Sequence, residues 1–286
     1  MKKLRSSALT LASLALLASN ARADFHDHVG LQMWSLRATT LAKGLPASLD
    51  VVKGFGLTEV ETGGSTGSLS PEQIRAALDE RGLKAVSSHV NYEQMTKDLT
   101  AVIKGVKTMG AKYAFCPWIP HQGVFDAATA QRAAEDFNKW GEAFRAEGIR
   151  FGYHPHGYEL VPTATAGETL LDDLIRATRP DAVCLEMDVF WIFHGGGDPV
   201  KLLEKYSSRW VALHVKDIRK GAPTGKPTGK APDTDNVAVG SGQLDWKAII
   251  GTAQKHGASL FFIEDETPAP LENIPVSQAY LKALKL

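Results

Sequence analysis

The sequence predicts an α/β protein whose parallel strands and helices form a closed (β/α)₈ barrel, that is, a TIM barrel. Two observations lead to this fold class. Apolar, β-branched runs alternate with helix-like segments, and several of these runs end in side chains that can bind a metal ion. In such a barrel the carboxyl ends of all strands face one side, where functional side chains gather. We therefore expect one barrel domain over residues 24–286, with its site at that end.

The alternation continues along the chain from residue 29 onwards. Ser70 followed by Pro71 is a typical helix start, and Gly110 and Gly148 stand where a glycine commonly ends a helix. The expected strands are residues 29–36, 58–62, 83–89, 112–116, 149–154, 182–188, 210–217 and 259–264. The expected helices are residues 45–55, 71–81, 93–109, 127–147, 168–178, 199–206, 245–256 and 276–284. This strict alternation favours a closed barrel over an open doubly wound sheet.

One connection differs from the others in composition. Residues 219–236 are rich in glycine, proline, threonine and lysine and have no apolar periodicity. We expect a mobile loop at the mouth of the seventh strand, with the length to act as a lid.

The composition is that of a globular protein with a large core. Of the 286 residues, 44% are hydrophobic, and the 32 basic side chains balance the 32 acidic ones. A net charge of zero gives no electrostatic reason to expect nucleic acid or an anionic membrane as a partner. Cys116 and Cys184 are the only cysteines, and each lies in an apolar run, so a disulfide scaffold is excluded.

The first 23 residues have the three parts of a secretory signal peptide. Residues 1–5 are basic, residues 8–18 are apolar, and Ala21-Arg22-Ala23 has the small-x-small pattern of a cleavage site. The apolar run is too short to span a bilayer comfortably, which disfavours an uncleaved anchor. We expect cleavage after Ala23 and a secreted mature protein without a membrane anchor, in the periplasm of a Gram-negative organism.

The predicted sixth, seventh and eighth strands each end in a potential metal ligand. These residues are Asp188, His214 and Glu264, which would be neighbours in a closed barrel. Burying such groups without partners costs several kcal/mol, so a ligand or a metal is expected to meet them. Imidazole and carboxylate groups together suit Mn²⁺, Mg²⁺, Co²⁺ or Zn²⁺. The fifth strand offers the fourth ligand, either His154 by its register or Glu159 by its charge.

The strand ends also carry motifs that resemble those of a known enzyme superfamily. The segment 153–156, Tyr-His-Pro-His, is followed by Glu159 and is similar to a Tyr-His-Asn-His…Glu motif. The other similar segments are residues 30–35, 186–191, 214–217, 239–242 and 263–264. Together they cover essentially the whole chain after the predicted signal peptide. They resemble the sugar phosphate isomerase/epimerase superfamily, the xylose isomerase-like barrels.

The resemblance implies a divalent metal held by a Glu, Asp, His and Glu set. The last three fall on Asp188, His214 and Glu264, whereas the position of the first glutamate falls on His154. Epimerases of the superfamily also tend to have a histidine three residues after the aspartate, and here that residue is Trp191. Both departures argue against the two-carboxylate mechanism of these epimerases.

The resemblance also implies the chemistry. The metal would bind adjacent carbonyl and hydroxyl oxygens of a sugar and stabilise the enediolate that forms when a neighbouring carbon loses a proton. The expected proton acceptor is Glu264 or Glu159. His89, His156 and Lys216 are expected to handle hydroxyl protons. The remaining expected substrate contacts are the rings of Trp34, Trp118 and Trp191 and the polar groups of Glu186 and Asp217.

Three functions are compatible with these patterns. The leading one is a secreted metal-dependent isomerase or epimerase of an unphosphorylated sugar, because the chain has an export signal and no phosphate-binding loop. The second is a lyase or hydratase of a keto-sugar or 3-keto-glycoside, which the residues at positions 154 and 191 favour. The third is a periplasmic sugar-binding barrel without catalysis, although a binding site alone does not require metal ligands on three consecutive strands.

Overall fold

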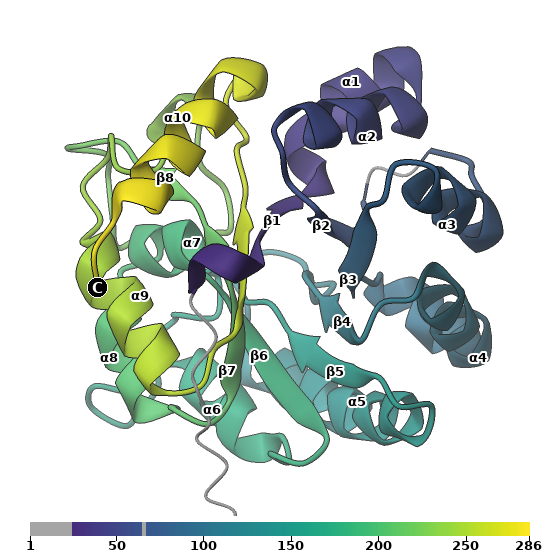
Figure 1. The fold of residues 1–286 in the computed structure, drawn as a ribbon. Helices are drawn as coiled ribbons and strands as arrows, with labels where there is room; N and C mark the ends of the chain where they lie inside the picture. Colours follow the sequence, from purple (N-terminus) through teal and green to yellow (C-terminus); the bar gives the residue numbers. More distant parts are fainter. Residues whose placement is uncertain (1–24, 65–66) are drawn as a thin grey trace, which may run out of the picture.

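The computed structural model describes residues 25–64 and 67–286 (Figure 1), so the predicted signal peptide lies outside the described residues. Eight parallel strands close into a barrel in the order β1-β10-β7-β6-β5-β4-β3-β2, which confirms the (β/α)₈ prediction. The strands are β1 (Val29–Gln32), β2 (Glu59–Thr62), β3 (Lys84–His89), β4 (Tyr113–Cys116), β5 (Arg150–Tyr153), β6 (Val183–Asp188), β7 (Trp210–Val215) and β10 (Leu260–Ile263).

The helices lie around the outside of the barrel (Figure 1). They are α1 (Arg37–Lys43), α2 (Leu45–Gly54), α3 (Pro71–Asp79), α4 (Tyr92–Met109), α5 (Ala127–Ala146), α6 (Leu170–Ala177), α7 (Val189–His194), α8 (Pro199–Lys205), α9 (Trp246–Lys255) and α10 (Pro270–Ala283). The expected start of α3 is confirmed, since Ser70 is the N-cap, Pro71 is the first helical residue, and Ser70 and Gln73 form a reciprocal capping box. In the part of the chain that the structure describes, no helix is both long and apolar enough to cross a membrane.

The barrel interior is filled by apolar side chains beneath a polar upper layer. Phe115, Ala212 and Phe262 belong to a small buried cluster that is separate from the main core between strands and helices. Two glycines make room for the phenylalanines. A Cβ at Gly30 would lie 2.9 Å from the Phe262 ring, and one at Gly152 would lie 2.6 Å from the Phe115 ring. The apolar filling therefore supports the mouth from below, as in other barrels of this kind.

Several local elements differ from the expected ones, and one of them is α1, since no helix was expected over Arg37–Lys43. The first strand ends at Gln32, because Met33–Leu36 forms a 3₁₀ turn that leads directly into α1. A helix that was not predicted, α7, starts immediately after β6, with the carboxylate of Asp188 accepting from the N–H of Trp191 as its cap. The last helix begins at Pro270 and continues through Pro275, so it is longer than the expected 276–284.

The segment expected to be a mobile loop is anchored at its base. β8 (Asp217–Ile218) pairs antiparallel with β9 (Asn236–Val237), and Arg219 forms an ion pair of 2.6 Å with Asp235. Further out, Gly229 lies against Trp118 and Tyr158, so closely that a Cβ would be 2.8 Å from the tyrosine ring. The loop therefore packs across the rim toward the β4 and β5 ends of the barrel.

Candidate functional site

The side chains of the site alternate along their strands. Glu186 and Asp188 are two residues apart at the end of β6, and His214 and Lys216 are two residues apart at the end of β7 and just beyond it. Because successive side chains of a strand point to opposite faces, both members of each pair point into the barrel. All four side chains are buried. They meet at the carboxyl end of the barrel, where the sequence predicted the site.

The four predicted metal ligands lie together. Nδ1 of His214 is 3.2 Å from Oε2 of Glu264 and 3.9 Å from Oδ2 of Asp188. Nε2 of His154 is 3.7 Å from the same aspartate oxygen. The ligand atoms of Asp188, His214 and Glu264 all lie within 4.8 Å of one another, a spacing that could hold a metal ion.

Asp188 supplies the observation that tests whether these residues fit a metal. Its Oδ1 caps α7, but its Oδ2 is buried and makes no hydrogen bond. The groups nearest to Oδ2 are His154, His214 and the Lys216 ammonium, at 3.7 to 3.9 Å. A buried carboxylate oxygen without a hydrogen bond is costly, and a divalent ion would satisfy it. The donor set and this unpartnered oxygen therefore fit a divalent metal.

Two further carboxylates hold the other nitrogen atoms of the histidine ligands. Nδ1 of His154 lies 2.9 Å from Oε2 of Glu186, and Nε2 of His214 lies 2.6 Å from Oε2 of Glu61. Metal-binding histidines usually donate their second N–H to such a partner, which sets the tautomer and the ring orientation. Glu61 is itself held by Gln32 Nε2 at 2.6 Å and by Ser87 Oγ at 2.5 Å.

His89 joins these two carboxylates. Its Nε2 is 3.1 Å from Glu61 and 3.0 Å from Glu186, and its ring stacks on that of His214 at 5.2 Å. Burial alone would lower the pKa of His89, but Glu61 and Glu186 raise it to about 9. Burial alone would likewise raise the pKa of Glu61, but His89 and His214 lower it well below its ordinary value. His89 therefore bridges the two buried acidic side chains, and their charge favours its protonated form.

Lys216 balances the carboxylates on the other side of the site. Its Nζ lies 3.1 Å from Glu264, 2.5 Å from Glu266 and 3.7 Å from Asp188. Burial alone would lower the lysine pKa, but Glu264 and Glu266 raise it well above its ordinary value, so the side chain stays an ammonium. The rings of Phe190 and Trp191 cover it at 5.3 and 5.2 Å.

Asp217 lies outside this group, contrary to the expected substrate contact. It follows Lys216 directly, so its side chain points away from the barrel interior. Its carboxylate accepts from the indole N–H of Trp246 at 2.9 Å and from backbone N–H groups. Those backbone donors belong to Ile218, Gly240, Gly242 and Leu244. The role of Asp217 is therefore to hold the loops around β8 and β9.

Glu159 is absent from the group formed by Asp188, His214 and Glu264, and also from a second group that could hold a metal ion, which comprises His89, His154, Glu186 and His214. It is buried, and its Oε1 accepts from the hydroxyl of Tyr153 and from the backbone N–H of His156 at 3.1 Å. Tyr153 points outward from β5 into the main core, which explains why Glu159 follows it there. Burial raises the pKa of Glu159 to about 7. Of the two candidates from the fifth strand, His154 lies beside the ligand group, and Glu159 lies outside it.

A cavity of about 260 Å³ opens above the ligand group. Its lining includes His89, His156 and Glu264 from the predicted site. Trp34 and Trp118 also line it and are 38% and 36% exposed, so both can contact a ligand. Trp191, in contrast, is only 7% exposed and lies behind this lining against Lys216. Burial lowers the pKa of His156 to about 3, so its ring is neutral.

Sequence reasoning missed three residues of the site. Gln32 and Glu266 line the mouth cavity, and Glu266 accepts from the indole N–H of Trp34 at 2.8 Å. Glu61 holds His214 from below. The rule that polar residues at strand ends mark the site also applies to Glu61. It was overlooked because Glu59 makes the run less apolar than those of the later strands.

The comparisons with known proteins agree with this geometry. A sequence profile of the xylose isomerase-like TIM barrel family matches residues 49–284. The chain belongs to this family. Two relatives of this xylose isomerase-like barrel are named inosose dehydratase. The one from Lacticaseibacillus casei is 26% identical over 241 residues, which cover 75% of this chain and 79% of that protein. The one from Geobacillus kaustophilus is 27% identical over 175 residues, and the chain spans about half of it, 55%.

Solved structures share the fold of this xylose isomerase-like barrel. A sugar phosphate isomerase/epimerase from Parabacteroides distasonis superposes with a TM-score of 0.72 at 24% identity, covering 90% of this chain and 98% of that one. An IolI protein with a bound zinc atom gives a TM-score of 0.68 at 14% identity, covering 89% and 95%. At these identities the likeness concerns the fold, and the family as a whole contains sugar-modifying enzymes.

Proposed function

We propose that this protein is a metal-dependent lyase that acts on an unphosphorylated keto-sugar or keto-glycoside. The observation that carries the proposal is the buried, unpartnered Oδ2 of Asp188, which faces His154 and His214 beneath a sugar-sized cavity. The relatives named inosose dehydratase support elimination as the reaction type. The residues that would hold the ion are His154, Asp188, His214 and Glu264.

The reaction breaks two bonds of the substrate. A carbon next to the carbonyl loses its hydrogen as a proton, and the C–O bond one carbon further breaks. Its electron pair goes to the leaving oxygen, which takes up a proton and departs as water or an alcohol. A divalent ion at the site would supply a Lewis acid for the carbonyl and a neighbouring hydroxyl oxygen. No oxidant or reductant is required, because the substrate already contains the ketone.

Different side chains are assigned to accept and to donate the two protons. Lys216 is buried and does not line the cavity, and its ammonium orients the carboxylates of Glu264 and Glu266, which do line it. Glu266 lines the cavity, is not among the metal ligands, and is oriented by Trp34 and Lys216, so we assign it as the proton acceptor. His89, which also lines the cavity, donates to the leaving oxygen. Glu264 is the alternative acceptor, as the sequence suggested.

The cavity lining supports an unphosphorylated substrate. Among the described residues that line the mouth cavity there is no arginine and no lysine, whereas Glu264 and Glu266 are acidic. A phosphate group would meet carboxylates there without the cationic partners that it normally requires. The predicted signal peptide is consistent with such a substrate, and we propose export on that pattern. Mass spectrometry of the mature protein, expected to start at Asp24, tests it.

The same site could also serve the isomerase or epimerase function. Both reactions begin with removal of a proton next to a carbonyl, and the Parabacteroides distasonis structure carries that description. Turnover of keto-sugars in deuterated water separates the two. We expect an enone, or released water or alcohol, and deuterium at an inverted carbon in an otherwise unchanged sugar would establish epimerisation instead. Binding without turnover on keto-sugars and keto-glycosides would favour the sugar-binding barrel.

Two substitutions separate the proposed acceptors. Glu266→Gln is expected to abolish turnover while bound metal per chain stays at the wild-type value, because Glu266 is not a ligand. Glu264→Gln is expected to lower both. Full turnover in Glu266→Gln would assign the acceptor role to Glu264.

A further inference from the structure

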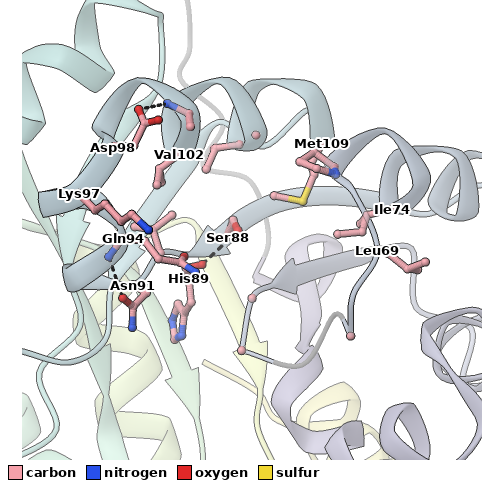
Figure 2. A pocket seen from close by; sticks show the side chains of 18 residues that line it. Leu69, Ile74, Ser88, His89, Asn91, Gln94, Lys97, Asp98, Val102 and Met109 are labelled. Atoms are coloured by element: carbon pink, nitrogen blue, oxygen red, sulfur yellow. Dashed lines mark hydrogen bonds between the residues drawn. The ribbon is translucent and has the colours of Figure 1, made fainter.

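A long groove leads away from the mouth cavity between α3 and α4. Its volume is about 930 Å³, and its lining comes from the loop after β2, from α3, from the end of β3 and from α4. The residues that line both the groove and the mouth cavity are Gly63, Gly64, His89, Val90 and Asn91. Figure 2 shows His89 and Asn91 at one end of the groove and Leu69 and Met109 at the other. The two spaces are therefore adjacent and share part of their walls.

The groove changes its chemistry along its length. Near the mouth, Asn91, Gln94 and Lys97 are exposed polar side chains. The change occurs at Asp98, where the α4 backbone is non-helical (φ −154°, ψ 81°) and the carboxylate accepts from the N–H of Ala101 at 3.0 Å. Beyond this break the lining is mostly apolar and comprises Leu69, Ile74, Val102, Val106 and Met109.

Gly63 shapes the junction between the two spaces. Its backbone has a φ of +115°, and a Cβ there would lie 2.6 Å from the carbonyl oxygen of His89. Gly63 therefore packs directly on the backbone of His89, which a residue with a side chain would prevent. His89 lines both the cavity and the groove, so this residue lies at their junction.

We propose that the groove binds the apolar aglycone of a glycoside whose sugar ring occupies the mouth cavity. This inference rests on the proposed function and narrows its substrate from keto-sugars in general to keto-glycosides. The mouth cavity, about 260 Å³, is at the small end of ligand pockets, which suits one sugar ring. The groove, at about 930 Å³, has room for a much larger group.

The lining favours an apolar aglycone over a second sugar. Sugar rings are usually held by aromatic faces together with many polar partners, and no Phe, Tyr or Trp is among the described residues that line the groove. Aliphatic side chains fill the far end instead, where an aryl or alkyl group gains by leaving water. The glycosidic oxygen of such a substrate would lie at the junction, beside His89. The leaving alcohol would then already be seated in its exit path.

A binding series tests the groove without requiring turnover. The probes are methyl, phenyl and 2-naphthyl 3-keto-glucosides in both anomers, titrated into metal-loaded protein by calorimetry. We expect the dissociation constant to fall about 10- to 100-fold from the methyl to the naphthyl compound. Val102→Phe places a ring in the apolar part of the groove, just beyond Asp98, and is expected to bring this ratio close to one. Thr100→Phe adds the same ring at an exposed position of α4 outside the groove and is the matched control, with the wild-type ratio.

Each outcome bears on one of the two proposals. Equal affinity for all three glycosides, or an unchanged ratio in Val102→Phe, would overturn the groove as an aglycone site. A stronger gain from a keto-disaccharide than from the naphthyl glycoside would also overturn it, because the occupant would then be a sugar. A ratio that depends on Val102 without turnover of any probe would uphold the groove while refuting the lyase proposal. Turnover of the probes combined with equal dissociation constants for all three glycosides would uphold the lyase proposal and refute the groove as an aglycone site.

Discussion

Lys216 and Asp217 are neighbours in the chain, yet they belong to two buried polar networks of opposite character. The carboxylate of Asp217 is fully used by one indole and four backbone N–H donors. Inside the barrel, Lys216 belongs to a buried cluster of carboxylates and imidazoles. In this cluster, Oδ2 of Asp188 and Oε1 of Glu186 make no hydrogen bond. A network with every lone pair satisfied supports the fold, whereas one with unpartnered atoms has capacity left for a ligand.

The largest effect is expected from His214→Ala, inside the barrel. The substitution removes a proposed ligand and the partner of Glu61, so bound metal and turnover should both fall more than about 100-fold. The apolar layer below the mouth is unchanged, so the far-ultraviolet circular dichroism spectrum should remain that of a folded barrel. Metal analysis and activity measure the loss. Full metal occupancy in this variant would refute the site.

Asp217→Ala is the opposite test, outside the barrel. It leaves the indole N–H of Trp246 and four backbone N–H groups without an acceptor, so the free energy of unfolding should fall by about 3 kcal/mol or more. Bound metal per folded chain should stay at the wild-type value. Urea denaturation together with metal analysis measures both quantities. If the metal were lost while stability remained, the two networks would have been assigned the wrong way round.

Glu61→Gln sharpens the comparison within the barrel. Glutamine keeps the size of the side chain but removes the charge that orients Nε2 of His214, so metal affinity should weaken about 10- to 100-fold. Glu59→Gln, two residues earlier on β2 and next to His28, is the control with unchanged affinity. Competition with a chelator gives both dissociation constants. Equal affinities in the two variants would show that Glu61 does not position His214.

Glu159→Gln has the smallest expected effect and tests stability rather than catalysis. Burial raises the pKa of Glu159 to about 7 in the folded chain, above its ordinary value of 4.5. The folded state therefore prefers the protonated form, and its contribution is complete at low pH and lost as the pH rises through about 7. The wild type should lose about 2–3 kcal/mol over this range and the variant less. Denaturation between about pH 5 and 8 measures it, and turnover should persist.

The comparison also shows how far sequence reasoning reaches. Alternating apolar runs and helix signals determined the barrel, because strand and helix periods are local properties of the chain. The same patterns placed Asp188, His214 and Glu264 together, since all parallel strands of a barrel end on one face. The resemblance to the family added His154 as the replacement for a glutamate, and the structure brings it to 3.7 Å from Asp188.

Only the tertiary structure decided the direction and the partners of individual side chains. Asp217 and Glu159 are carboxylates, the residue type expected in a metal or catalytic site. The position of Asp217 along the strand turns its side chain out of the barrel. Glu159 is buried outside the barrel because it hydrogen-bonds to the outward-facing Tyr153. Glu61 meets His214 from 153 positions away in the chain. The groove likewise arises where two helices pack beside a loop. Such contacts depend on chain closure in space, and residue type and spacing carry little information about them.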